Sequence, residues 1–223
     1  MSALDGKIIS HLRWITRRSK VMNSFIIASF IVILMPGTGF VYTISTGVTR
    51  GKKSGVYAAV GCTLAIIPHM IAGIFTMFFL TNINDMVFQS VKFVGVIYLI
   101  YLGITMIRGK VSYEMEQEDK KISNLKIGLK GMLINLLNPK LTVFFLAFIP
   151  QYIDKSERNI LMQSIQLDMI FLVISLLVFL IYALLSGSVF YFIEKGNQKL
   201  SWLPRLSGII FIVFSIQLLV SRI

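Results

Sequence analysis

Long apolar runs alternate with short polar segments along the whole chain. Each run has about the 17–25 residues that a helix needs to cross roughly 30 Å of hydrocarbon. The runs are Met22–Thr46, Val56–Leu80, Val87–Ile107, Gly131–Tyr152, Leu167–Ile193 and Leu203–Val220. Together they take up over half of the 223 residues. The pattern predicts an all-α polytopic membrane protein with six hydrophobic segments and no separate soluble domain.

Composition and charge agree with this prediction. A mean hydropathy of +0.78 excludes an ordinary soluble domain. The formal charge of +12 comes from basic residues between the apolar runs, where the positive-inside rule and anionic headgroups account for them. No nucleic-acid-binding module is visible. The expected partners are therefore the lipid bilayer and a small-molecule substrate, and a homo-oligomer is left open.

The residue types give little support to catalysis or metal binding. Two histidines and one cysteine, Cys62, cannot supply the usual zinc ligands, and a single cysteine forms no intramolecular disulfide. Paired acids, or a nucleophile beside a base, are not visible at helical spacing. We expect no enzymatic activity, no cofactor and no resident metal.

Proline interrupts two of the apolar runs, at Pro36-Gly37 in the first and at Asn138-Pro139-Lys140 in the fourth. Proline lacks a backbone donor and clashes with the preceding turn, so each motif should break its helix. In hydrocarbon a break leaves backbone groups unpaired, which is tolerated only where protein buries them or a wet cavity meets them. We expect the two breaks to face each other across a transport site.

A broken helix offers free N–H groups at one end and free carbonyls at the other. The N–H groups suit a carboxylate and the carbonyls suit an ammonium group, so a zwitterion such as an amino acid fits both. Lys140 could add a carboxylate partner, and a purely helix-capping role for the asparagines stays open. The predicted substrate-binding residues are Pro36, Gly37, Thr38, Gly39, Tyr42, Asn135, Asn138, Pro139 and Lys140.

Two ionisable residues inside the apolar runs are candidates for proton coupling, because such residues are costly in a membrane. His69 lies on a face of small residues in the second run, and its alternative role is structural, as a neutral imidazole bonded to a neighbouring helix. Asp168 lies near the start of the fifth run, where the alternative is a carboxylate at headgroup depth. The small-residue face consists of Ala58, Gly61, Ala65, His69, Ala72 and Thr76.

The chain divides into a basic, amphipathic arm (1–21) and one membrane domain (22–223) with two halves. The halves (22–107 and 129–223) are joined by a polar loop (108–128), and the first run of each contains the proline break. Three segments per half would make the second half insert upside down, which is typical of transporters with inverted repeats. The basic loops after runs one, three and five should be cytoplasmic. Either six spans leave the basic arm outside, or the first run is a re-entrant hairpin with five spans; the sequence leaves both open.

Two motifs resemble the LysE/RhtB-type family of amino-acid exporters. They are Pro36-Gly37 followed by Arg50-Gly51-Lys52-Lys53-Ser54-Gly55, and Gly131-Met-Leu-Ile-Asn-Leu-Leu-Asn-Pro-Lys140 followed by Phe145-Leu-Ala-Phe-Ile-Pro-Gln-Tyr152. The resemblance runs from about residue 22 to the end. It implies a multi-pass protein of the bacterial inner membrane that exports amino acids, driven by the proton motive force. The family commonly has Pro-Gly-Pro-Asn where this chain has Pro36-Gly37-Thr38-Gly39.

The sequence therefore predicts a secondary exporter of amino acids or related small zwitterions. The alternatives are an exporter of another small solute or of a divalent metal cation, and a passive channel. Clustered carboxylates or thiols, which a metal path needs, are not visible in the apolar runs. Matched breaks favour alternating access over a pore without excluding the pore.

Overall fold

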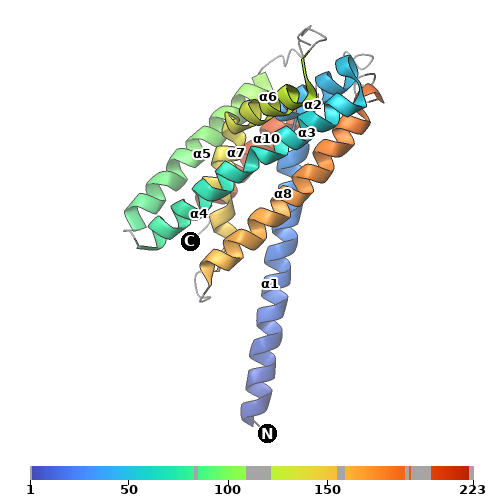
Figure 1. The fold of residues 1–223 in the computed structure, drawn as a ribbon. Helices are drawn as coiled ribbons and strands as arrows, with labels where there is room; N and C mark the ends of the chain where they lie inside the picture. Colours follow the sequence, from blue (N-terminus) through green and yellow to red (C-terminus); the bar gives the residue numbers. More distant parts are fainter. Residues whose placement is uncertain are drawn as a thin grey trace.

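The computed structural model describes residues 2–82, 85–108, 122–154, 159–188, 191 and 202–220, and every element in these residues is helical, as predicted. In chain order the elements are α1 (Ser2–Leu34), α2 (Thr38–Arg50), α3 (Lys52–Leu64), α4 (Ile66–Asn82), α5 (Asp85–Arg108), α6 (Asn124–Leu136), α7 (Pro139–Val143), η1 (Phe144–Phe148), η2 (Ile149–Tyr152), α8 (Ile160–Leu184) and α10 (Trp202–Val220). The segment η1 is a π-helix and η2 is a 3₁₀-helix. The helices form one elongated bundle (Figure 1).

Several helices are long and apolar enough to cross a membrane. In the described part of the chain, Lys52–Met77 and Ile160–Leu184 meet this test alone, and two bent pairs raise the number to 4 if each is one span. The bent pairs are Arg18–Leu34 with Thr38–Arg50, and Asn124–Leu136 with Pro139–Tyr152. The protein is thus a multi-pass helical membrane protein.

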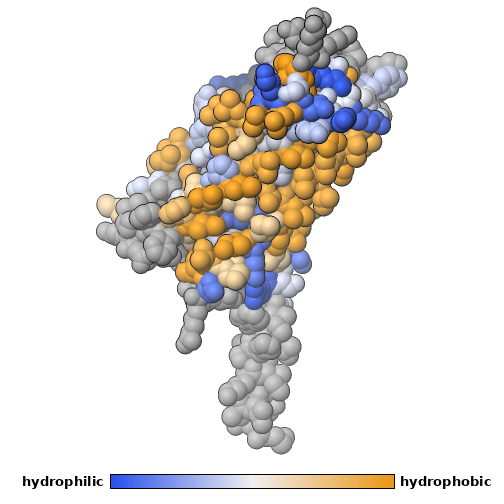
Figure 2. Space-filling model, viewed as in Figure 1, coloured by the Kyte–Doolittle hydropathy of each residue, from blue (hydrophilic) through white to orange (hydrophobic). Residues whose placement is uncertain are grey.

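Helix α8 shows the arrangement expected for lipid surroundings, with an apolar outer face and polar residues inside. Its exposed residues recur at steps of three or four: Leu161, Ile165, Met169, Val173, Leu177, Ile181 and Leu184. Its buried face includes Ser164, Asp168, Ser175 and Tyr182. Figure 2 shows hydrophobic side chains along the flank of the bundle, with hydrophilic ones gathered at the end where α2 meets α3.

Both predicted helix breaks are present. The axes bend by 55° between α1 and α2 and by 53° between α6 and α7. Helix α6 begins at Asn124, well before the apolar run, because the Ser123 hydroxyl caps it by accepting a hydrogen bond from the Lys126 backbone N–H. The break after Leu136 therefore falls near the middle of the bent pair.

Helix α3 packs against α2, α6 and α8, and α5 packs against α10. At the α3–α6 crossing the backbones touch, since a Cβ added to Gly61 would collide with the Gly128 backbone. Ala58 and Ala65 on the same face are fully buried, as the predicted small-residue face requires. Ala72, beyond the interruption at Ala65, is exposed instead.

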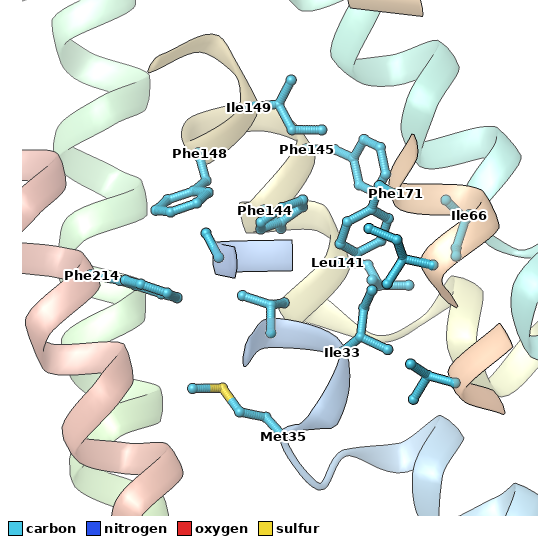
Figure 3. Close-up of a cluster of buried hydrophobic side chains, with 14 of the residues drawn as sticks. Ile33, Met35, Ile66, Leu141, Phe144, Phe145, Phe148, Ile149, Phe171 and Phe214 are labelled. Carbon is cyan, nitrogen blue, oxygen red and sulfur yellow. The ribbon is translucent and has the colours of Figure 1, made fainter. Parts of the chain in front are cut away.

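An aromatic cluster fills the centre of the bundle around η1 (Figure 3). Phe144 stacks on Phe171 of α8 with ring centroids 4.5 Å apart, and Phe148 contacts Phe214 of α10 at 4.9 Å. Phe25 of α1 lies 6.4 Å from the Phe144 ring. These rings join α1, η1, α8 and α10 into one core, so η1 is held from several sides.

The backbone of the basic arm is helical and continues without interruption into the first apolar run, as the single helix α1. Its beginning extends well beyond the rest of the bundle (Figure 1). The division at residue 21 stays a prediction.

The α3–α6 contact gives a first testable prediction. Replacing Gly61 with alanine should force the two backbones apart and cost about 3 kcal/mol of stability, or about 6–12 °C in melting temperature. The thermal unfolding of the detergent-solubilised protein measures this. The control is Gly187→Ala, since a Cβ there meets nothing within 4 Å; equal losses for both variants would contradict the close crossing.

Candidate functional site

The first break exposes the carbonyls that end helix α1. In a continuous helix the Val32 carbonyl would accept a hydrogen bond from residue 36, but Pro36 has no N–H to donate. The Lys140 ammonium takes that place, with Nζ 3.0 Å from the Val32 oxygen and 3.1 Å from the Met35 oxygen. The Tyr182 hydroxyl lies 3.4 Å from the Leu34 oxygen. Side chains of the second half therefore satisfy the end of α1.

The second break is organised by two asparagines. Asn138 precedes Pro139 and has extended backbone (φ −76°, ψ 106°), since a residue before proline is disfavoured in the helical region. Its side-chain oxygen accepts from the Lys140 backbone N–H at 3.1 Å, and its Nδ2 donates to Asn135 Oδ1 at 3.0 Å. Asn135 Nδ2 in turn donates to the Cys62 carbonyl at 2.7 Å. The amides thus both cap the break and join it to α3.

His69 lies at the corresponding end of α6. Its ring lies beside the backbone carbonyls of Asn135 and Leu136 and packs nearly parallel to the Phe145 ring, with centroids 6.2 Å apart. Residue 135 would pair with residue 139 in a continuous helix, but proline supplies no N–H, and the Asn135 oxygen instead accepts from the Asn138 backbone N–H at 3.1 Å. The side chain is 7% exposed, and its Nε2 finds no hydrogen-bond partner among the described residues. A basic residue from each half thus meets the broken helix of the other.

The two breaks border a common cavity between α1, α2, α6, α7 and α8. Its polar lining includes Asn135, Asn138, Lys140 and Ser175, and its apolar lining includes Phe171 and Phe179. The volume is about 10 Å³, which is room for about one water molecule. The structure therefore shows the space between the breaks in a closed form.

Glycines let the two breaks approach each other. A Cβ on Gly37 would lie 3.3 Å from Lys140 Nζ, and one on Gly39 would lie 2.9 Å from Asn135 Oδ1. The distance at Gly37 is shorter than most Cβ contacts in proteins, and the distance at Gly39 is shorter than any that real Cβ atoms normally make. Side chains at these two positions would thus displace the polar groups of the second break.

Not every predicted binding residue faces this cavity. Gly37, Gly39, Asn135, Asn138 and Lys140 line it. The other predicted binding residues do not line it: Pro36 is buried, Thr38 and Pro139 are exposed, and Tyr42 is partly buried.

Tyr42 makes its contacts away from the cavity, since its hydroxyl donates to the Ile127 carbonyl at 2.9 Å. Ser175 lines the cavity and was not among the predicted binding residues. It is buried and its hydroxyl has no partner among the described residues. A hydroxyl in the middle of the most apolar run was its only signal in the sequence.

Asp168 lies on the same buried face of α8 as Ser175, about 10 Å or two helical turns before it. The side chain is only 2% exposed, so it does not project into the surroundings as a headgroup-level carboxylate would. The preceding residues, Gln166 and Leu167, line a second cavity of about 120 Å³ near the end of the bundle. That cavity is also lined by Arg18 and Asp154. Asp168 thus lies between the end cavity and the central cavity.

The buried amide chain gives a second prediction. Replacing Asn135 with alanine would leave the Cys62 carbonyl and the Asn138 amide without their partners, at a cost of about 2–3 kcal/mol. Melting of the solubilised protein should fall by about 4–12 °C. Gln217→Ala, at an exposed position of α10, is the control and should melt like the wild type. An Asn135 variant as stable as the control would show that the amide chain does not hold the break.

Comparisons with known proteins agree with this arrangement. A model of the LysE type translocator family matches residues 30–222. A leucine efflux protein of Klebsiella pneumoniae is 27% identical, with 87% of this chain and 92% of that protein covered. A homoserine/homoserine lactone efflux protein of Salmonella typhimurium is 26% identical, covering 85% and 91%, and an uncharacterized membrane protein of Vibrio cholerae is 27% identical, covering 79% and 86%. No solved structure matches.

The match to the family model spans both helix breaks and all the residues that line the central cavity. Relatives named as efflux proteins have nearly the same length as this chain. The protein is therefore a transporter and not an enzyme, and it belongs to the LysE-type translocator family.

Proposed function

We propose that this protein exports amino acids, or closely related small zwitterions, across the bacterial inner membrane, in exchange for protons. Membership of the LysE family and the efflux of leucine and homoserine named for its relatives support the substrate class. The observation that carries the proposal is the meeting of the two broken helices at one buried polar cavity.

Both charges of a zwitterion have a complement at this cavity. The carbonyls of Val32 and Met35 already accept an ammonium group, that of Lys140, which indicates that this helix end suits a cation. The N-terminus of α2 has Gly37 at its cap, with no side-chain cap. Its first N–H groups therefore suit a carboxylate. One amino acid could bridge both helix ends.

Transport then requires the closed cavity to open to each side in turn. A volume of about 10 Å³ is far below the size of an amino acid, so α1–α2 and α6–α7 must separate for substrate to bind. Breaks at corresponding positions of two halves are typical of transporters that rock one repeat against the other. The remaining predicted binding residues, Pro36, Thr38, Tyr42 and Pro139, would act by shaping these breaks.

We further propose six membrane crossings, with two inverted halves. Helices α1 and α8 run parallel, since Arg18 bonds to Gln166 at one end and Tyr182 to Leu34 at the other. Six crossings place the first and fifth segments in the same direction, whereas a re-entrant first segment would place α1 antiparallel to α8. The bend of 55° also leaves α2 continuing away from α1 instead of returning beside it. The basic arm then lies opposite the basic loops.

His69 and Asp168 are the candidates for moving protons to and from the cavity. His69 lies at the broken end of α6, and Asp168 lies between the end cavity and the central cavity. Both are buried ionisable groups, which in membrane proteins are typical of proton paths.

Transport in inverted membrane vesicles tests the proposed function. We expect a labelled amino-acid mixture to be accumulated when a proton gradient is imposed, with one or two amino acids selected, and accumulation to collapse when the gradient is dissipated. Movement without concentration would indicate a passive channel. No movement of any amino acid, with intact protein in the membrane, would contradict the proposal and direct the assay to divalent metals and other small solutes.

Pro139 offers a sharper test of the broken-helix site. Alanine at this position supplies an N–H for the Asn135 carbonyl and frees Asn138 to become helical, so α6 and α7 can join. We expect transport to fall at least about tenfold, by analogy with the loss of positioning groups in other sites, while membrane insertion is kept. Pro204→Ala, in α10 and away from both breaks, is the matched control. Parental transport by the Pro139 variant would show that the break is not needed.

A further inference from the structure

The ammonium of Lys140 is placed where the proposed function puts the ammonium of the substrate. Its Nζ bonds to the carbonyl oxygens of Val32 and Met35 at 3.0 and 3.1 Å. These carbonyls form the C-terminal end of α1, which attracts cations. A lysine head group and an amino-acid ammonium are the same chemical group, so one site serves both.

The surroundings of Lys140 contain no counter-charge among the described residues. The cavity lining includes no carboxylate, and α4, α5 and α8 add no ionisable residue to it. Titratable groups on the neighbouring helices act elsewhere: the Tyr182 hydroxyl on the Leu34 carbonyl, His69 beside the α6 carbonyls and the Cys62 thiol on the Gly131 carbonyl at 3.4 Å. Asp168 lies about two helical turns before the cavity-lining Ser175 on α8. Lys140 is therefore balanced only by backbone carbonyls.

We infer that Lys140 holds the place of the substrate ammonium in the empty transporter, and that substrate binding displaces it with loss of its proton. Lys140 Nζ already bonds to both the Val32 and the Met35 carbonyl oxygens. A second ammonium cannot join it there, because like charges repel strongly in a buried site. Gly37 leaves the space in which the lysine head group sits. This inference rests on the proposed export of zwitterions.

The exchange balances both charge and protons. Substrate entering from the cytoplasm brings one ammonium to the α1 carbonyls, and the proton of Lys140 Nζ leaves to water on that side. After substrate has left on the outer side, the neutral amine takes a proton from outside and returns to the carbonyls. One proton therefore moves inward for each substrate exported. The substrate ammonium and the protonated Lys140 compete for the same carbonyls. His69 and Asp168 are candidates for the route that the proton takes.

Calorimetry on the purified, full-length protein tests this directly. L-leucine and L-homoserine are titrated in two buffers of different ionisation enthalpy, which gives the number of protons released per ligand bound. We expect about one proton for the wild type, and an affinity that weakens about tenfold per unit of pH lowered while Lys140 is protonated. Wild-type binding without proton release would overturn the inference, because Lys140 would then keep its charge beside the substrate.

Two variants of Lys140 separate displacement from a structural role. Lys140→Met removes the competitor and should bind without proton release and without the pH dependence. Lys140→Arg keeps a charge that is not lost in proteins and should weaken binding at least about tenfold at every pH. Gln217→Ala, at an exposed position of α10, is the control and should still release the proton. Proton release by the methionine variant, or wild-type affinity in the arginine variant, would each overturn the inference.

The outcomes also separate this inference from the proposed function. A wild type that moves no amino acid in vesicles and binds none contradicts the proposed function, and the inference is lost with it. A wild type that transports an amino acid but releases no proton on binding leaves the exporter in place and removes only the role of Lys140. Exchange of labelled for unlabelled substrate should persist in Lys140→Met while accumulation driven by a proton gradient is lost.

Discussion

The absence of one N–H group in each of two prolines dominates the architecture of this transporter. Pro36 leaves the Val32 carbonyl without its helical donor, and Pro139 does the same to the carbonyl of Asn135. In hydrocarbon such a group costs several kcal/mol unless protein or water satisfies it. Lys140 supplies the donor at the first break, whereas at the second the Asn135 carbonyl accepts from the Asn138 N–H at 3.1 Å, with the His69 ring beside it. Lys140 thus ties the second half to the first break, and the Cys62 carbonyl, which accepts from Asn135 Nδ2, ties the first half to the second break.

This reciprocity explains why the breaks must lie together and why the bundle is closed around them. Burial of the Lys140 charge is costly, and with no carboxylate in the cavity lining that the structure describes, only the Val32 and Met35 carbonyls offset that cost. The amide chain from Asn138 through Asn135 to the Cys62 carbonyl fixes the second break to α3. Because α3 also contacts α2 and α8, any opening of the cavity has to move helices as units.

Much of this could be predicted from the sequence, because hydrophobic length and proline position are local properties. The apolar runs predicted the class, and Pro36 and Pro139 predicted where the helices break. The donor at each break could not be predicted, since Lys140 is over 100 residues away from Val32 and only packing brings them together. In the structure Lys140 bonds to the Val32 and Met35 carbonyls, and its expected pairing with a substrate carboxylate stays a prediction. Ser175 was missed for the same reason: its role depends on which face of α8 is buried.

The departure of this chain from the usual family pattern also has a physical meaning. Gly39 stands where the family commonly has asparagine, and a Cβ at this position would lie 2.9 Å from Asn135 Oδ1 and 3.1 Å from the Phe179 ring. An asparagine here is incompatible with the observed positions of both side chains. With glycine, the space beside the break is instead filled by Asn135, whose amide is already committed to the Cys62 carbonyl. The side-chain amide beside the first break therefore comes from Asn135 of the second half and not from residue 39. Its hydrogen bond to the Cys62 carbonyl fixes its orientation.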